Sequence, residues 1–444
     1  MAIETVQAKE ATTPPSASSR LTGLRCRNCG RLEAFGPSYV CADCFGPLEV
    51  AYDLSAIAGT LDAATIAGRD PGIWRYLELL PVDARPQRGL PVGSTPLLPA
   101  ERLGRHLGID HLLIKDDTRN PSLSFKDRAV AVAAARAVEF GMDTLACAST
   151  GNLAGATAAA AAALGLPAYV FIPADLEQPK IDHALAYGAT VVPVEGTYDD
   201  VNRLCLEIAG ETGWGFVNIN LRPFYAEGSK TLAFEIAEGL GWRAPDVIVA
   251  PIASGAMFTK LAKGFEELAA IGLVEATPIR FVGAQPAGCA PVATAWSRGT
   301  TIIDPIRTPT TFVRSLAIGN PADGRYAVEL AQACGGSIEA VPDEDTAAAI
   351  RAVASLEGIY PETAGGVTLG AAAAALRRGI IRRGDMVVAL MTGNGLKTPE
   401  ARNLGDDGIG PDLVRTPARA GQPGLAAPIR PSYAAFEAWL ERGS

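Results

Sequence analysis

The chain has 444 residues, a length that suits two or three domains and excludes a small disulfide-stapled scaffold. Hydrophobic residues make up 48% of it but aromatic residues only 6%, so alanine and small aliphatic residues must supply most of the apolar content. This composition predicts a soluble protein of closely packed helices rather than a disordered or fibrous one. The formal net charge of -9 argues against nucleic acid as a partner, because affinity for phosphates needs a surplus of cations.

The first twenty residues contain no apolar segment of the signal-peptide type. Their composition is typical of a flexible tail. We therefore expect a cytoplasmic protein.

Four of the eight cysteines form two close pairs with eleven residues between the pairs: Cys26, Cys29, Cys41 and Cys44. Two such CxxC knuckles around a hairpin-sized spacer predict a tetrahedral zinc site. Because protein would fill all four coordination positions, we expect a structural Zn2+ in a ribbon over residues 21–52. The alternative is four unrelated reduced thiols. Three arginines balance three acidic residues in this segment, so it offers no basic face for nucleic acid.

After the ribbon, residues 53–90 contain a short helical stretch at 73–80, and we interpret them as a connector. From about Leu112 the chain alternates apolar runs with amphipathic runs, a pattern typical of βαβ units and a largely parallel sheet. Strands are expected at residues 112–114, 144–148, 168–172, 190–194, 216–219, 247–250, 279–283 and 386–390. The helices between them include 199–213 and 345–358, and a last helix follows Ser432.

Residues 153–173 form an uncharged stretch about as long as a membrane span. Alanine and glycine dominate it, and Gly165-Leu-Pro167 divides it into an alanine helix and a short strand. We therefore predict no transmembrane helix and no membrane partner.

The segment from Asn120 to Arg128 follows the first predicted strand and opens a helix of alanines and valines. Lys126 would lie in the first turn, where an apolar wall and the positive end of the helix both favour a neutral amine. Such an amine suits a lysine that forms a Schiff base. A surface lysine paired with Asp127 is the alternative, and this segment alone does not decide between the two.

Three further loops also follow predicted strands, and open α/β sheets bind ligands at the carboxyl ends of their strands. Residues 149–152, with the sequence Ser-Thr-Gly-Asn, can form a small anion cradle at a helix N-terminus. Residues 251–259 open another helix with small residues that let backbone N–H groups approach a phosphate. The last loop is Thr-Gly-Asn-Gly-Leu-Lys at 392–397. Taken alone, each of the first two is also explained as a helix start or a tight turn.

Together these loops resemble those of fold type II pyridoxal-phosphate enzymes, and in particular those of threonine synthases. The resemblance runs from about Leu24 to Pro399, and its most specific pieces are the segments NPSLSFKDR, STGN, YAEGSKT, SLAIGNP and TGNGLK. The ribbon, ending in CFGPLEV and followed by AYD, is similar to that of longer members of the family. The resemblance implies an α/β fold of the tryptophan synthase β type, with two α/β domains of parallel-rich sheets, pyridoxal 5'-phosphate as cofactor and a homodimer.

The resemblance also implies roles for individual residues. Lys126 corresponds to the lysine that holds the cofactor and later moves protons, and Asn152 to the residue that faces the ring hydroxyl. Thr392 corresponds to the residue whose hydroxyl bonds the pyridine nitrogen of the cofactor. A neutral hydroxyl favours a protonated ring less than a carboxylate would, so the cofactor withdraws electrons less strongly. Ser149 and Thr150 would receive the substrate carboxylate. The phosphate cup would be the backbone of Ala253, Ser254, Gly255, Ala256 and Met257.

The implied reaction converts O-phospho-L-homoserine and water into L-threonine and phosphate, so the small-molecule substrate carries a phosphate of its own. Arg222, which precedes a proline, is the candidate to hold that phosphate, with a solvated or paired arginine as the alternative. The cup departs from the usual Gly-Asn-(Gly/Ala)-Gly-Asn pattern, so its place depends on context. We expect no histidine base, because His106, His111 and His183 lie in segments away from these loops.

With this resemblance the chain divides into six parts: a flexible tail at 1–20, the ribbon at 21–52, the connector at 53–90, a large cofactor-binding domain at 91–125 and 233–410, a small α/β domain at 126–232, and a C-terminal extension at 411–444.

Three other functions are possible for such a sequence. The first is another enzyme of the same fold, such as a serine or threonine dehydratase or a cysteate synthase. The others are a zinc-ribbon interaction module and a dinucleotide-dependent oxidoreductase. TGNGLK with the ribbon favours the threonine synthases, and no G-x-G-x-x-G motif supports the oxidoreductase.

Overall fold

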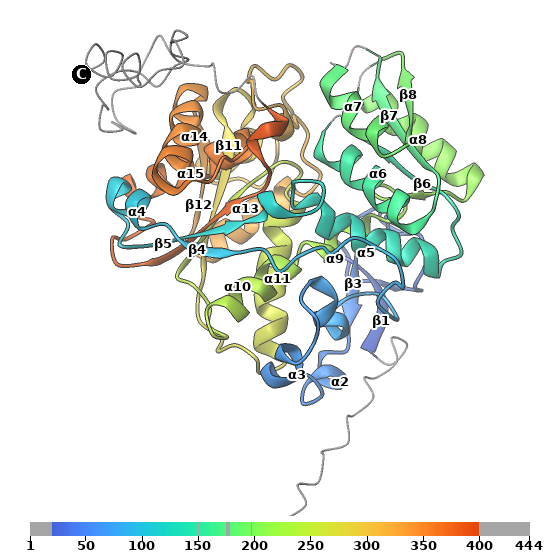
Figure 1. Cartoon of the computed structure of the whole chain (residues 1–444), viewed down its shortest axis with the longest axis horizontal. Helices are drawn as coiled ribbons and strands as arrows, with labels where there is room; N and C mark the ends of the chain where they lie inside the picture. Colours follow the sequence, from blue (N-terminus) through green and yellow to red (C-terminus); the bar gives the residue numbers. More distant parts are fainter. Residues whose placement is uncertain (1–19, 150, 175–177, 197, 399–444) are drawn as a thin grey trace, which may run out of the picture.

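The computed structural model describes residues 20–149, 151–174, 178–196 and 198–398 (Figure 1). Most of the predicted tail, the whole predicted C-terminal extension with its helix, and Thr150 lie outside the described residues.

The predicted ribbon segment forms a three-stranded antiparallel sheet in the order β2-β1-β3. Its strands are β1 (Leu21–Cys26), β2 (Leu32–Glu33) and β3 (Leu48–Tyr52). The predicted connector follows, with the short helices α2 (Leu54–Ile57) and α3 (Ala63–Ala67) and the 3-10 helix η1 (Ile73–Leu79). The helical stretch expected at 73–80 is therefore present, with tighter winding than an α-helix.

A four-stranded parallel sheet occupies the region drawn in green, in the order β8-β7-β6-β9 (Figure 1). Its strands are β6 (Leu145–Ala148), β7 (Ala168–Pro173), β8 (Thr190–Val194) and β9 (Gly215–Phe216). The accompanying helices are α5 (Lys126–Glu139), α6 (Asn152–Leu164), α7 (Gln178–Ala186) and α8 (Tyr198–Thr212). The uncharged stretch thus divides into α6 and β7, as predicted. Among the described residues we find no helix whose length and apolarity would carry it across a bilayer.

Strand β9 is shorter than the sequence predicts, because a turn replaces its second half. The Phe216 carbonyl accepts hydrogen bonds from the N–H groups of Ile219 and Leu221, and the Asn220 Oδ1 accepts one from the Phe216 N–H at 2.8 Å. The side chain of Asn220 thus takes the place of a strand partner, and such local competition is typical of asparagine.

The second large sheet has six strands in the order β12-β11-β10-β13-β5-β4, and only β4 runs antiparallel to its neighbour. The strands are β4 (Leu97–Pro99), β5 (His111–Asp116), β10 (Val247–Pro251), β11 (Arg280–Pro286), β12 (Ser337–Val341) and β13 (Met386–Met391). The pattern of apolar runs predicts the four central strands and misses β4 and β12. Both missed strands are edges, where shorter and more polar strands are usual.

Residues on the two faces of the six-stranded sheet belong to two separate cores. Ile248 and Ala250 of β10 pack into one core, and Val247 and Val249 of the same strand pack into the other, as the two-residue period of a strand requires. Helices α10 (Thr231–Gly239), α11 (Ala256–Ala270), α12 (Pro291–Ser297) and α13 (Gly324–Ala333) contribute to the first core. Helices α4 (Glu101–Leu107), α14 (Asp343–Glu357) and α15 (Thr363–Arg377) contribute to the second.

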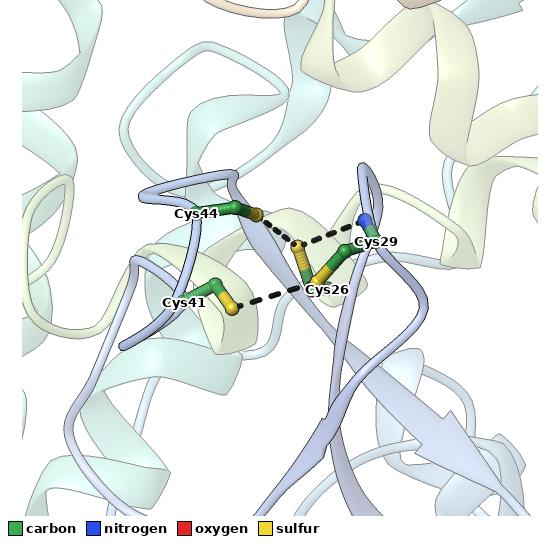
Figure 2. A group of neighbouring side chains, drawn as sticks. All are labelled: Cys26, Cys29, Cys41 and Cys44. Atoms are coloured by element: carbon green, nitrogen blue, oxygen red, sulfur yellow. Dashed lines mark hydrogen bonds between the residues drawn. The ribbon is translucent and has the colours of Figure 1, made fainter.

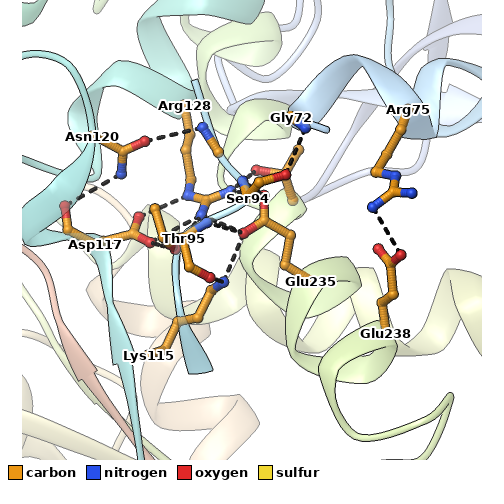
Figure 3. A network of polar contacts seen from close by, with 12 residues as sticks. Gly72, Arg75, Ser94, Thr95, Lys115, Asp117, Asn120, Arg128, Glu235 and Glu238 are labelled. Carbon is orange, nitrogen blue, oxygen red and sulfur yellow. Dashed lines mark hydrogen bonds and ion pairs between the residues drawn. The ribbon is translucent and has the colours of Figure 1, made fainter. Parts of the chain in front are cut away.

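A buried polar network fixes the start of α5 to the six-stranded sheet (Figure 3). The fully buried Arg128 donates to Asp117 Oδ2 at 2.7 Å and to both carboxylate oxygens of Glu235, each at 2.7 Å. Lys115 of β5 donates to Glu235 Oε2 at 2.7 Å and to the Thr95 carbonyl at 2.6 Å. Burial alone would raise the pKa of Glu235, but the cations of Arg128 and Lys115 lower it to about 2. The Glu235 carboxylate is therefore ionised at neutral pH.

A second ionic cluster attaches the ribbon sheet to the body. Lys260 of α11 donates to Glu49 of β3 and to the buried Glu227, both at 2.8 Å. Lys263 donates to the Val50 carbonyl at 2.7 Å and to Glu227 at 3.0 Å. Glu227 belongs to α9 (Arg222–Gly228), so one carboxylate joins two helices beneath the ribbon strand.

We predict that R128M strongly destabilises the protein, because it leaves the buried carboxylates of Asp117 and Glu235 without their shared cation. The expected loss is about 3–5 kcal/mol in the free energy of unfolding, measured by urea denaturation. Arg325 supplies a matched control, since its ion pair with Glu329 is exposed and R325M should cost about 0–1 kcal/mol. Equal losses in the two variants would contradict a structural role for the network.

Candidate active site

Lys126 is the first residue of α5, as the sequence predicts. Its Nζ donates to the Tyr225 hydroxyl at 2.7 Å and lies 4.8 Å from the centre of the Phe125 ring. The alternative of an ion pair with Asp127 is wrong. The Asp127 carboxylate instead accepts from the backbone N–H and the hydroxyl of Ser122, at 2.7 and 2.6 Å. The amine of Lys126 is therefore held between two aromatic rings.

The loop that precedes Lys126 lies against the loop that follows β13. The Phe125 N–H donates to the Thr392 carbonyl at 2.9 Å, and Ser124 and Gly393 form an antiparallel bridge. Thr392 itself is buried directly beyond the end of β13. Two of the four predicted loops are thus joined by backbone hydrogen bonds, and this contact brings Thr392 next to the residue that precedes Lys126.

Asn152 begins α6, and its amide is held from both sides. Its Nδ2 donates to the two carboxylate oxygens of Glu362 at 2.9 and 2.8 Å, and its Oδ1 accepts from Lys397 Nζ at 3.0 Å. The predicted loop at residues 149–152 therefore meets the loop at 392–397 through Lys397. The predicted cradle for the substrate carboxylate consists of Ser149 and Thr150. Ser149 is buried directly after β6, and its Oγ accepts from the Gly151 N–H at 3.2 Å. Thr150 lies outside the described residues.

Glu362 is a residue of this site that the sequence prediction missed. It is buried at the start of α15, and its N–H donates to the Gly393 carbonyl at 2.9 Å. A Cβ on Gly393 would lie 2.3 Å from Glu362 Oε1, so a larger residue there would displace the Glu362 carboxylate. The available sequence signal is an acidic residue directly before a helix of glycine and alanine, where a buried charge needs a partner.

The predicted phosphate cup lies between β10 and α11. Gly255 precedes the helix with a φ of 96°, and a Cβ there would lie 2.8 Å from the Asp323 carbonyl oxygen, so both conformation and space require glycine. The Ser254 hydroxyl accepts from the Ala256 N–H at 3.5 Å, and the N-cap residue Gly255 has no side chain to bond the N–H groups that follow. Those backbone N–H groups point toward the positive end of the helix, where an anion is favoured.

Arg222 begins α9, one turn before Tyr225, so the two side chains share a face of that helix. Its guanidinium donates to Asp323 Oδ2 at 2.6 Å. The alternative of a paired arginine is therefore confirmed, whereas the role of Arg222 toward the substrate phosphate stays a prediction.

The expectation that all three histidines lie away from these loops is wrong for His183. A Cβ on Gly155 of α6 would lie 2.2 Å from His183 Nδ1, so the ring packs against the helix that Asn152 begins. Burial and, to a smaller extent, the Lys397 cation lower the pKa of His183 to about 4. The ring is therefore neutral near pH 7 and a weak base.

The residues of this site fit a phosphorylated aldehyde cofactor. They comprise a lysine amine, an amide at the start of α6, a hydroxyl beyond β13 and a helix N-terminus that follows a glycine turn. Two buried hydroxyls of the loops that meet here, Ser124 Oγ and Thr363 Oγ1, have no hydrogen-bond partner among the described residues. Because buried polar atoms are normally paired, these two hydroxyls leave hydrogen-bonding capacity unused beside the site.

Four cysteines in the ribbon are placed to hold a metal ion (Figure 2). Their Sγ atoms all lie within 4.8 Å of one another, with Cys26 and Cys44 3.5 Å apart and Cys29 and Cys41 3.7 Å apart. Four sulfurs bound to a tetrahedral zinc at about 2.3 Å would be about 3.8 Å apart. The donor set therefore matches zinc in chemistry and in size.

The chain is similar to known proteins over most of its length. The family model of the "Pyridoxal-phosphate dependent enzyme" matches residues 89–393. A threonine synthase of Methanocaldococcus jannaschii is 35% identical over 379 residues, which are 85% of this chain and 93% of that protein. A threonine synthase of Methanosarcina acetivorans is 36% identical over 382 residues, 85% of this chain and 92% of that protein.

Solved structures agree in fold. The processed form of threonine deaminase isoform 2 from Solanum lycopersicum matches with a TM-score of 0.58 and 25% identity, over 70% of this chain and 84% of that one. Maize serine racemase matches with a TM-score of 0.57 and 20% identity, over 68% and 88% of the two chains.

Glu362 gives a prediction about pH. Burial raises the pKa of this carboxyl, and the Asn152 hydrogen bonds and the Lys397 and Lys126 cations offset the rise only in part. A pKa above the unfolded value of about 4.3 means that Glu362 stabilises the fold at low pH and loses this contribution as the pH rises. We expect the unfolding free energy of E362Q, relative to the wild type, to increase as the pH rises above the unfolded-state pKa of about 4.3, as measured by urea titrations at several pH values. The exposed Glu344 provides the control variant E344Q, and a constant difference for E362Q would contradict the prediction.

Proposed function

The chain belongs to the pyridoxal-phosphate dependent enzymes and, among them, to the threonine synthases, and from this we propose how its residues perform the reaction. It is a lyase that converts O-phospho-L-homoserine and water into L-threonine and phosphate. The observation that carries this function is the 35% identity to a threonine synthase over 93% of that protein's length.

Pyridoxal 5'-phosphate, when bound, supplies an electron sink that stabilises negative charge on the substrate carbons. We propose that Lys126 holds this cofactor and moves protons at its Nζ. The 2.7 Å hydrogen bond from Nζ to the Tyr225 hydroxyl supports this role, because it orients the amine from the side of α9. Phe125 and Tyr225 also limit the access of water to that amine.

We propose the remaining roles from the resemblance to the family. Asn152, held by Glu362 and Lys397, would face the ring hydroxyl of the cofactor, and Thr392, just beyond the end of β13, would face the ring nitrogen. The backbone of residues 253–257 receives the cofactor phosphate at the start of α11. Ser149 and Thr150 take the substrate carboxylate. Arg222 takes the substrate phosphate, since it lies one turn from Tyr225 on α9.

Further parts of the proposal concern the protein as a whole. We infer that the four ribbon cysteines hold a structural Zn2+, that the enzyme works in the cytoplasm, and that two chains form a homodimer. The division into a large domain at 91–125 and 233–410 and a small one at 126–232 is consistent with the separate six-stranded and four-stranded sheets. Residues 53–90 would then connect the ribbon to the large domain.

The function is tested by supplying O-phospho-L-homoserine to the purified holoenzyme. Phosphate and threonine should form in equal amounts, and K126A should lower kcat by at least about 100-fold, because it removes the group that moves the proton. Borohydride should bleach the yellow colour of the wild-type protein and leave the reduced cofactor covalently attached to Lys126, and far-UV circular dichroism should show that K126A is folded. Pyruvate or 2-oxobutanoate as the main product, or an adduct on another lysine, would contradict the proposal.

The zinc site is tested by metal analysis of the intact chain. We expect about one zinc ion per chain, lost in C44S and on treatment with a strong chelator, with a lower unfolding temperature in both cases. Cys334 lies outside the cluster, so C334S should keep the metal. A zinc content that is unaffected by C44S would show that the four thiols do not form the site.

A further inference from the structure

One arginine of the ribbon reaches out of the ribbon into the body of the protein. Arg27 lies between Cys26 and Cys29, and its side chain is only 16% exposed. Its guanidinium donates to Asp323 Oδ1 at 2.8 Å and lies 3.7 Å from the centre of the Tyr326 ring. The hydroxyl of Tyr326 also donates to the side chain of Asn28. The first cysteine knuckle is therefore docked on the start of α13.

Asp323 precedes α13 but does not cap it. An aspartate at this position usually accepts from the first N–H groups of its own helix, whereas here no such bond is present. The carboxylate, 6% exposed, accepts instead from Arg27 on one oxygen and from Arg222 on the other. Asp323 is thus shared by an arginine of the ribbon and the arginine that we assign to the substrate phosphate.

The same aspartate touches the proposed phosphate cup of the cofactor. Its N–H donates to the Ser254 carbonyl at 2.8 Å, and a Cβ on Gly255 would meet its backbone at 2.8 Å. Arg222 reaches it from α9, the helix on which Tyr225 holds Lys126. The charges of Asp323, Arg27 and Arg222 therefore lie beside the site and at the end of the six-stranded sheet where β10 stops.

The balance of these charges decides how an anion is received. A lone carboxylate at 2.6 Å would neutralise Arg222 and repel a phosphate nearby. With Arg27 on its other oxygen, the three groups carry a net charge of one positive unit. The substrate of the reaction carries a phosphate, so a surplus of positive charge at this place favours its binding.

We propose that Arg27 is a positioning residue for the phosphate-bearing substrate: it neutralises Asp323, so that Arg222 is free to bind the phosphate group of the substrate. This inference rests on the proposed role of Arg222. It gives the ribbon a part in substrate recognition in addition to metal binding. Arg31, in the same ribbon, pairs only with the exposed Asp43 among the described residues and reaches nothing in the body.

The first test compares R27A with R31A in the full-length holoenzyme. We expect R27A to raise both the KM for O-phospho-L-homoserine and the inhibition constant of inorganic phosphate by about tenfold, with kcat and inhibition by threonine changed less than about twofold. R31A should change none of these constants. Unchanged phosphate affinity in R27A, measured also by calorimetric titration with inorganic phosphate, would overturn the proposal.

The second test separates neutralisation from simple bracing of the loop. If Arg27 acts by neutralising Asp323, adding D323N to R27A removes the negative charge that holds Arg222. The double variant should then recover most of the lost phosphate affinity. If Arg27 only braces the loop, the double variant R27A/D323N should bind phosphate no better than R27A, which would overturn the proposal. Cofactor content, read from the visible absorbance, should stay the same in all variants. Loss of cofactor in R27A with unchanged phosphate affinity would also overturn it.

R222A separates this proposal from the proposed function. If R222A weakens phosphate binding and R27A does not, only the role of Arg27 fails. If R222A leaves phosphate binding unchanged, the assignment of Arg222 fails, and the role of Arg27 with it. If no variant and no wild-type protein forms threonine, the proposed reaction fails, while the calorimetric titration still reports on Arg27.

Discussion

The buried guanidinium of Arg128 is the interaction on which the rest of this structure depends. It lies two residues after Lys126 and binds carboxylates from two other elements, Asp117 after β5 and Glu235 on α10. A guanidinium keeps its charge at any pH that a folded protein survives, and its fork can serve both carboxylates at once. The first turn of α5 is therefore fixed to the six-stranded sheet, although α5 itself packs with the helices of the other sheet. Figure 3 shows how the network also takes in the link before β4, through Ser94 and Thr95.

Much of the fold and part of the site can be predicted from the sequence, because both depend on local patterns. Apolar runs predict the central strands, and small residues after a strand indicate the loops at Lys126, Asn152 and Gly255. The edges β4 and β12 are missed, since edge strands carry weaker patterns. Glu362 is missed for another reason: its partner Asn152 is 210 positions away, and no local rule connects an amide with a carboxylate at that distance.

The small residues noted in the composition have a structural explanation in the contacts between helices. A Cβ on Gly228 of α9 would lie 2.3 Å from the Arg128 carbonyl oxygen, so α9 and α5 touch through their backbones. The alanines of α5 are buried along the same helix. Close approach of this kind leaves little space for adjustment, since protein interiors are packed as densely as crystals. It also places Tyr225 within reach of Lys126.

The contact between Glu49 and Lys260 has a consequence for the order in which the chain folds. The two residues are 211 positions apart, so during synthesis the ribbon emerges long before α11 exists. Until then Glu49 has no cation from that helix, although the apolar residues of β3 can already pack on α5 and α9. Contacts at such a separation are slow to form, because a long loop must close before they contribute any free energy. The ribbon is thus made long before it reaches its final contacts.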